Sequence, residues 1–166
     1  MKCILETNRL ILRELNITDA SSFYQLNLNP KNIQYTGDKP FDSIEDAKIF
    51  LENYKDYVDN GYGRWACITK DTNTFIGWCG LKYDKNQNET DIGFRFFEEY
   101  WNKGFATESA TACLNYGFNK LALSRIVGKA MVENKASIKV LEKIGLSFEK
   151  NILMDEKAAV LYAINK

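Results

Sequence analysis

The chain has 166 residues, and its 22 lysine and arginine residues balance 22 aspartate and glutamate residues. This length fits one domain, which we expect to span residues 1–166. The neutral net charge gives no general field that would attract nucleic acid or an anionic membrane, so neither is expected as a partner. The absence of histidine excludes histidine-based nucleophilic triads and histidine-ligated zinc, and we expect no metal site.

The sequence also bears on the compartment. No stretch approaches the ~18 apolar residues of a membrane-spanning helix, and the first residues do not form a secretory signal. The four cysteines are scattered, and a chain of this size can build a core without disulfide staples. We therefore expect a cytoplasmic protein with free thiols.

Hydrophobic periodicity divides the chain into strands and helices. Segments in which apolar and polar residues alternate predict strands, and apolar residues every three or four positions predict helices. Thr18 and Ser43 are plausible N-caps of the first two helices, and Gly145 ends the last one. The predicted strands are residues 9–15, 64–70, 74–83, 90–97, 125–132, 148–154 and 158–164, and the predicted helices are residues 18–29, 43–58, 105–118 and 135–144, with a surface loop over residues 31–39.

This order of elements predicts the fold class. It runs strand, two helices, three strands, helix, strand, helix, two strands, with turn signals that make the three middle strands an antiparallel meander. We expect an α/β protein with a mixed, mostly antiparallel sheet of about seven strands and about four helices on both faces. The order fits neither a doubly wound sheet nor a barrel.

A phosphate site is predicted where the third helix begins, after Gly104. The first backbone N–H groups of a helix have no partner within it and lie at the positive end of its dipole, so they can bind a diphosphate. Small residues at Gly104 and Ala106 let phosphate oxygens approach the backbone, Thr107 can donate its hydroxyl, and Asn102 or Lys103 can flank the ligand. The glycine alone would also fit an ordinary helix start.

Residues 101–109, Trp-Asn-Lys-Gly-Phe-Ala-Thr-Glu-Ser, resemble the coenzyme A pyrophosphate loop of the GNAT acetyltransferase superfamily, and more narrowly its RimJ/RimL-like branch. Residues 6–13, 91–94 and 134–146 are similar to further segments of that branch, in the same order. The resemblance implies a GNAT-like fold in which the fourth and fifth predicted strands splay apart. The pantetheine arm of acetyl-CoA would lie in the gap between them.

The resemblance also implies particular coenzyme contacts. Backbone groups of the fourth predicted strand would pair with the pantetheine amides like an additional strand, and one backbone N–H could polarise the thioester carbonyl. An asparagine would cap the last helix and also bond the coenzyme. The implied coenzyme-binding residues are Phe94, Arg95, Phe96, Asn102, Lys103, Gly104, Phe105, Ala106, Thr107, Asn134 and Ser137.

Two catalytic roles follow from the same resemblance. Asp91 would be the general base, acting through water, and Ser137 would donate a hydrogen bond to the leaving thiolate. Either residue could instead be structural, as an exposed strand carboxylate and a first-turn helix serine. Leu141 stands where many family members carry a tyrosine acid, so that acid is excluded here. Trp65 and Trp78 are expected to line the acceptor cleft.

The sequence therefore predicts direct transfer of an acetyl group from acetyl-CoA to a primary amine, with the α-amine of a peptide or protein N-terminus as the leading acceptor. A small amine, such as an amino acid, polyamine or amino sugar, is the second acceptor class, because residues 18–62 would form the acceptor surface and are the least diagnostic part. A module that binds acyl-CoA without catalysis is the third reading. A homodimer is expected from the resemblance alone.

Overall fold

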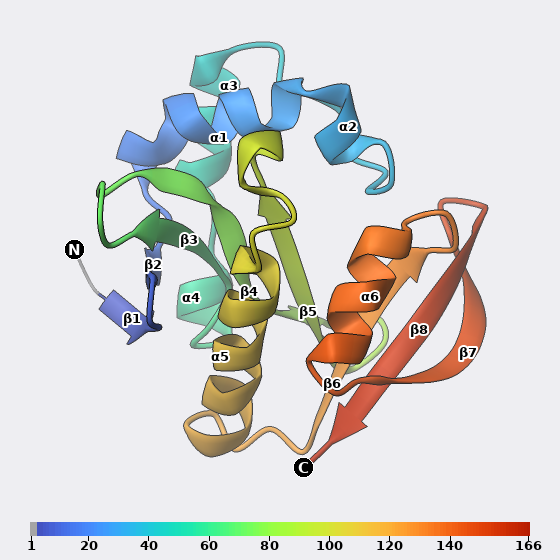
Figure 1. Cartoon of the computed structure of the whole chain (residues 1–166). Coiled ribbons are helices and arrows are strands. Elements are labelled where there is room, and N and C mark those ends of the chain that lie inside the picture. The colour runs from blue at the N-terminus through green and yellow to red at the C-terminus, as the bar shows by residue number, and fades with distance from the viewer. Residues whose placement is uncertain (1–2) are drawn as a thin grey trace.

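The computed structural model describes residues 3–166, which form one eight-stranded sheet with helices on both faces (Figure 1). The strand order is β1-β2-β3-β4-β5-β6-β8-β7, and every neighbouring pair is antiparallel except β5 and β6. The predicted fold class is confirmed, with one strand more than expected. The strands are β1 (Cys3–Glu6), β2 (Leu10–Glu14), β3 (Arg64–Thr69), β4 (Phe75–Asp84), β5 (Glu89–Phe96), β6 (Arg125–Met131), β7 (Ser147–Met154) and β8 (Lys157–Asn165).

The helices of the described chain lie mainly before β3 and on either side of β6. None of them combines the length and apolar character that crossing a bilayer requires. Two single 3₁₀ turns, η1 (Ile17–Asp19) and η2 (Glu98–Tyr100), precede longer elements. The helices are α1 (Ala20–Leu28), α2 (Pro30–Ile33), α3 (Ile44–Glu52), α4 (Asp56–Asp59), α5 (Phe105–Asn119) and α6 (Lys135–Lys143).

The sheet has a hydrophobic core on each face, and side chains of β3 contribute to both cores. Successive side chains of a strand point to opposite faces. Trp65 and Cys67 belong to the larger core cluster, which α5 and α6 cover. Ala66 and Ile68 belong to the smaller cluster, together with Phe23 of α1. Strand β3 is therefore buried on both sides, and each helix layer covers one face of the sheet.

The structure corrects the expected starts of the first elements. Strand β1 was missed, because it is four residues long and gains its order by pairing with β2. Thr18 is not an N-cap. Instead, Asn16 accepts the backbone N–H of Thr18, Asp19 accepts that of Asn16, and this capping box starts η1 earlier than predicted. The predicted loop over residues 31–39 begins with α2, which Pro30 opens at its first position.

The single helix predicted over residues 43–58 is in fact two short helices. Ser43 does cap α3 by accepting the backbone N–H of Asp46 at 3.1 Å. The chain then leaves the helix after Glu52, and the Tyr54 hydroxyl accepts the backbone N–H of Arg64 at 2.8 Å. Val58, predicted on the buried stripe, is 86% exposed in α4. A tertiary contact with β3 therefore overrides the helical pattern.

Three of the four cysteines are buried together where α5 packs on the sheet. Cys67, Cys79 and Cys113 are each 0% exposed, and the Cys79 and Cys113 sulfurs lie 3.7 Å apart. A disulfide needs a separation of about 2.05 Å, and all four thiols are free, as the sequence predicts. Burial raises the pKa of Cys67 and of Cys113 well above the ordinary value, so these two groups stay neutral. Cys3, in β1, is exposed.

Candidate functional site

Strands β5 and β6 diverge from a single point of contact. They are parallel neighbours, and the one residue pair that joins them is Asp91 with Val127. Beyond this pair the two strands diverge, with α5 on the β5 side of the opening and α6 on the β6 side (Figure 1). The predicted splay between these strands is confirmed. An opening of this kind leaves one edge of β5 without a strand partner, so its backbone groups can bind another extended chain.

The backbone of β5 has a definite polarity at this opening. Phe97, just after β5, donates its N–H to the carbonyl of Ile76 on β4 at 3.0 Å. Backbone N–H groups of an antiparallel strand alternate between its two edges. The N–H groups of Phe96 and Phe94 therefore point to the open edge, whereas the backbone of Arg95 faces β4. Of the three residues predicted to pair with the pantetheine arm, Phe94 and Phe96 therefore have their N–H groups at the open edge.

A cavity of about 490 Å³ lies at this opening. Side chains of α1 and of the loop after α2 line one side, β4 and β5 form the floor, and β6 and α6 line the other side. Elements far apart in the sequence thus meet around one space. Six of the predicted site residues lie in its wall: Trp78, Asp91, Phe94, Arg95, Asn134 and Ser137.

Of the two tryptophans predicted to line an acceptor cleft, Trp78 lines this cavity and Trp65 does not. Trp65 is 1% exposed and packs edge-on against Tyr116 of α5, with ring centroids 5.4 Å apart. It lies on the α5 face of the sheet, whereas Trp78 pairs with Ala66 and lies on the opposite face with the cavity. The prediction for Trp65 is therefore wrong, because alternation along β3 turns its ring away from the cavity.

Asp91 is held by an arginine that the sequence analysis missed. The Arg64 Nη2 donates to Asp91 Oδ2 at 2.7 Å, and its Nη1 donates to the carbonyls of Gly80 at 2.6 Å and Asp91 at 3.2 Å. The guanidinium lies across Gly93, where an added Cβ would come within 2.7 Å of Arg64 Cζ. Only glycine leaves room for this arrangement. Arg64 comes from β3, so no local motif could have indicated it.

The charge state of Arg64 follows from its surroundings. Burial alone would lower its pKa, but the attraction of Asp91 and the hydrogen bond to it hold the pKa of Arg64 above the ordinary value. Arg64 therefore keeps its positive charge. Among the described residues, Oδ1 of Asp91 has no hydrogen-bond partner and is available to a ligand or water in the cavity.

Arg95 ties the loop after α2 to the cavity wall. Its side chain donates to Asp38 Oδ2 at 2.6 Å and to Asn27 Oδ1 of α1. Together with Arg64 it flanks Trp78, the two guanidinium carbons lying 5.3 and 5.4 Å from the indole centroid. Both arginines are thus pre-positioned, and the indole is fixed between them.

Asn134 and Ser137 line the cavity from the start of α6. The Asn134 side chain caps this helix by accepting the backbone N–H of Ser137 at 3.2 Å, which confirms its predicted capping role. Leu141, one turn later, is 2% exposed and lines the cavity with an apolar side chain. The hydroxyl of Ser137 is therefore the side-chain hydroxyl that α6 offers at this wall.

The start of α5 forms a second corner of the site, outside the cavity wall. Asn102 and Gly104 both have left-handed backbones, with φ of 58° and 82°, and Gly104 is the N-cap of α5. The chain thereby turns sharply into the helix, and the first-turn amides of Phe105, Ala106 and Thr107 remain available. This is the geometry expected of an anion site at a helix N-terminus.

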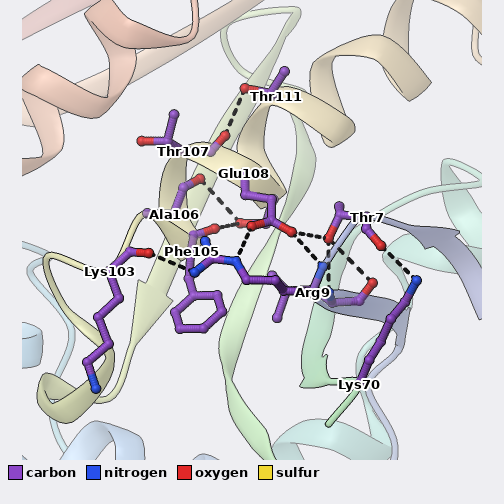
Figure 2. Close-up of polar contacts among 11 residues, drawn as sticks. Thr7, Arg9, Lys70, Lys103, Phe105, Ala106, Thr107, Glu108 and Thr111 are labelled. Carbon is purple, nitrogen blue, oxygen red and sulfur yellow. Dashed lines mark hydrogen bonds and ion pairs between the residues drawn. The ribbon is translucent and has the colours of Figure 1, made fainter.

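A second missed arginine lies at this corner (Figure 2). Arg9 donates from Nη1 to the carbonyl of Lys103 at 3.0 Å, and its guanidinium stacks over the Phe105 ring at 4.1 Å. Its Nη2 lies 3.4 Å from the place that a Cβ on Gly104 would occupy. Arg9 precedes β2, almost a hundred residues from the loop, so only the fold brings its positive charge to the helix start.

Glu108 holds Arg9 in place. Its carboxylate accepts hydrogen bonds from the Thr7 hydroxyl at 2.6 Å, the Arg9 N–H at 2.9 Å and Arg9 Nε at 2.7 Å (Figure 2). Burial raises the pKa of Glu108, but these bonds outweigh it and lower the pKa below its ordinary value. Because its charge is neutralised by Arg9, Glu108 does not oppose an anion at the start of α5.

We expect Glu108→Gln to lower the free energy of unfolding by roughly 2 kcal/mol at pH 7, because hydrogen bonds to a charged group are each worth about 1.5–3 kcal/mol. A carboxylate whose pKa is lowered by folding stabilises the protein above its unfolded pKa of about 4.3 and loses that effect as pH falls through the folded pKa. Denaturant titrations at several pH values should therefore show the difference shrinking only in acid. Glu99→Gln, an exposed carboxylate in η2, is the control; an equal loss there would contradict the assignment.

Comparison with known proteins identifies the family. Residues 9–147 match the family model described as an acetyltransferase (GNAT) domain. The uncharacterized N-acetyltransferase p20 of Bacillus licheniformis is 34% identical over 152 residues, which cover 90% of this chain and 84% of that protein. A GNAT-family acetyltransferase from Bacillus anthracis has a TM-score of 0.83 at 26% identity, covering 97% of both chains. Spermidine N-acetyltransferase from Vibrio cholerae, solved with CoA and spermine, has a TM-score of 0.80 at 22% identity, covering 94% of this chain and 95% of that one.

The chain therefore belongs to the GNAT acetyltransferase family, as its sequence motifs predict. Within that family it is an acetyl-CoA-dependent N-acetyltransferase.

Proposed function

We propose that the amine acceptor binds in the cavity beside Asp91, with the coenzyme phosphates at the start of α5 and the pantetheine arm between β5 and β6. The observation that carries this proposal is the opening of β5 from β6 after one residue pair. The open edge presents the N–H groups of Phe94 and Phe96 beside the cavity that contains Asp91 and Ser137. An extended ligand with amide groups can pair with such an edge.

The residues at the start of α5 fit a diphosphate. Gly104 leaves its side of the loop open, and the first-turn amides of Phe105, Ala106 and Thr107 can donate to phosphate oxygens. Arg9 adds a guanidinium beside Gly104, so we assign it as a further coenzyme contact. Asn102 and Lys103 flank the same turn. Acetyl-CoA bound here would supply the activated acetyl group, and the protein would align the acceptor with it.

The transfer itself needs one bond to form and one to break. The neutral amine attacks the acetyl carbonyl carbon, the carbon–sulfur bond breaks, and coenzyme A leaves as a thiolate. An ammonium has no lone pair, so one proton must leave first, and Asp91 Oδ1 is placed to accept it through a water molecule. A second proton leaves the nitrogen after attack, as the carbon–sulfur bond breaks, and passes through water to the departing thiolate. The N–H of Phe94 or Phe96 stabilises the carbonyl oxygen as charge develops, an effect typically worth ~3 kcal/mol. Ser137 donates to the thiolate.

The acceptor is either the α-amine of a peptide or protein N-terminus or a small amine. The test is release of free thiol from acetyl-CoA by the purified protein with peptides, amino acids, polyamines and amino sugars, together with mass spectrometry of each acceptor. Detection of an acetylated acceptor would show that the new carbon–nitrogen bond forms. Tight binding of coenzyme A with no product from any acceptor would instead establish a non-catalytic acyl-CoA-binding module.

We expect Ser137→Ala to lower kcat by about tenfold and to leave the Kd of coenzyme A unchanged, because one hydrogen bond to a charged group contributes about 1.5–3 kcal/mol. Steady-state kinetics and calorimetry would measure the two quantities. Ser147→Ala, at an exposed position in β7, is the matched control and should change neither. An unaltered kcat in Ser137→Ala would show that Ser137 does not stabilise the thiolate and that solvent does.

A further inference from the structure

The wall of the acceptor cavity has an excess of positive charge. The whole chain is formally neutral, with 22 basic and 22 acidic residues. The cavity wall instead has five cationic side chains and two carboxylates, a net charge of +3. This wall therefore has an excess of positive charge, although the whole chain is formally neutral. The cations are Lys39, Arg64, Lys82, Arg95 and Lys129, and the carboxylates are Asp38 and Asp91.

The coenzyme does not account for this charge. Its phosphates are assigned to the start of α5, and residues 102–107 lie outside the cavity wall. The pantetheine arm and the acetyl group are uncharged. The cations of the cavity therefore face the acceptor, and it is the acceptor that must be compatible with them.

The two wall carboxylates pair with the two arginines, and one of the three excess lysines has a partner outside the wall. Arg64 pairs with Asp91 and Arg95 with Asp38, while Lys129 lies 3.8 Å from Asp84, which is outside the wall. Two lysines, Lys39 and Lys82, have no ion pair or hydrogen bond within residues 3–166. Both are exposed, so their ammonium groups are free to bind an anion from the cavity.

Lys82 is the better placed of these two lysines. On the β4–β5 ladder its Cα is directly opposite that of Asp91. Directly opposite residues point to the same face, with Cβ atoms about 5 Å apart. A ligand in this part of the cavity thus meets a free ammonium next to the carboxylate that would accept its amine proton.

We propose that the natural acceptor is an amine that carries a carboxylate, with its amine directed to Asp91 and its carboxylate bound by Lys82. This inference rests on the proposed acetyl transfer and names its acceptor class, an amino acid or a short peptide with a nearby carboxylate. A polyamine would bring additional positive charge into a cationic cavity. The same potential favours loss of the ammonium proton and stabilises the leaving thiolate, because nearby cations disfavour a positive group and favour a negative one.

The experiment compares acids with their amides, which differ only in the carboxylate, and includes spermidine as a polyamine. Free leucine and leucinamide, glutamate and glutamate diamide, and spermidine are each assayed with acetyl-CoA for kcat/KM. An amide has a less basic α-amine than its parent acid, so amine protonation favours the amide and makes the comparison conservative. We expect the carboxylates to exceed their amides and spermidine by roughly tenfold or more, and the ratio to fall as salt is added.

The variants locate the effect in the cavity. Lys82→Gln should reduce the acid-to-amide ratio several-fold and Lys82→Arg should largely restore it, whereas Lys85→Gln, at an exposed site in the following turn, should leave the ratio unchanged. Equal rates for acids and amides, a preference for spermidine, or an unchanged ratio in Lys82→Gln would overturn the acceptor class while leaving acetyl transfer intact. No product from any acceptor would overturn the transfer, and the acceptor class with it.

Discussion

Gly104→Asp is expected to weaken coenzyme A binding by at least about 100-fold, since two like charges a few ångströms apart near a protein surface repel by several kcal/mol. The new carboxylate would be placed at the start of α5, where the first-turn amides and Arg9 are assigned to the phosphates. Its Cβ would begin 3.4 Å from Arg9 Nη2, so the carboxylate would also compete for that guanidinium. Calorimetric titration with coenzyme A measures the loss.

The control must separate charge from backbone strain. Gly104 has φ of 82°, a region that aspartate and asparagine tolerate better than most residues. Gly104→Asn has the same shape as Gly104→Asp without the charge, and we expect it to bind coenzyme A within about tenfold of the wild type. Thermal melting should show both variants folded. Equal affinities for the two variants would show that the phosphates do not bind at this corner.

Asp91→Asn is expected to lower kcat by about 100-fold or more, the usual contribution of a general base. The loss should be greatest below the pKa of the acceptor amine, where most acceptor molecules still carry the proton that must be removed. Asparagine keeps an oxygen that can accept the Arg64 Nη2 hydrogen bond, so the cavity floor should stay in place. Rates measured from acidic to alkaline pH supply the test.

A structural role for Asp91 would give a different pattern. Loss of the Arg64 partner would lower stability and depress kcat equally at every pH. Asp71→Asn, in the exposed turn between β3 and β4, is the matched control and should have the wild-type pH profile. A pH–rate profile in Asp91→Asn that keeps the wild-type shape would exclude Asp91 as the base.

The sequence predicted helices and strands correctly where the hydrophobic periodicity of a segment matches the side chains that are buried in the structure. The meander β3 to β5 and the helices α5 and α6 are such cases, since their apolar positions match the faces that become buried. Prediction failed where a distant contact determined the local conformation. The helix expected over residues 43–58 is interrupted at Tyr54, whose hydroxyl accepts a hydrogen bond from the backbone of Arg64. Strand β1 forms because it pairs with β2.

The same distinction applies to the candidate site. The turn at Gly104 and the cap at Asn134 are encoded by adjacent residues, and both could be predicted. Arg9 and Arg64 could not, because each reaches its partner from another strand. Trp65 shows a further limit: in a strand buried on both faces, alternation does not reveal which face borders the cavity.

The burial of Cys67, Cys79 and Cys113 has a practical consequence for labelling. A water-soluble alkylating reagent should react with Cys3 alone in the native protein, because the other three sulfurs are shielded. One fluorophore could thus be attached at the end of the sheet farthest from β7, without mutagenesis. Further label would then be incorporated slowly, as α5 transiently separates from the sheet. The rate of this incorporation would measure how often the interior opens.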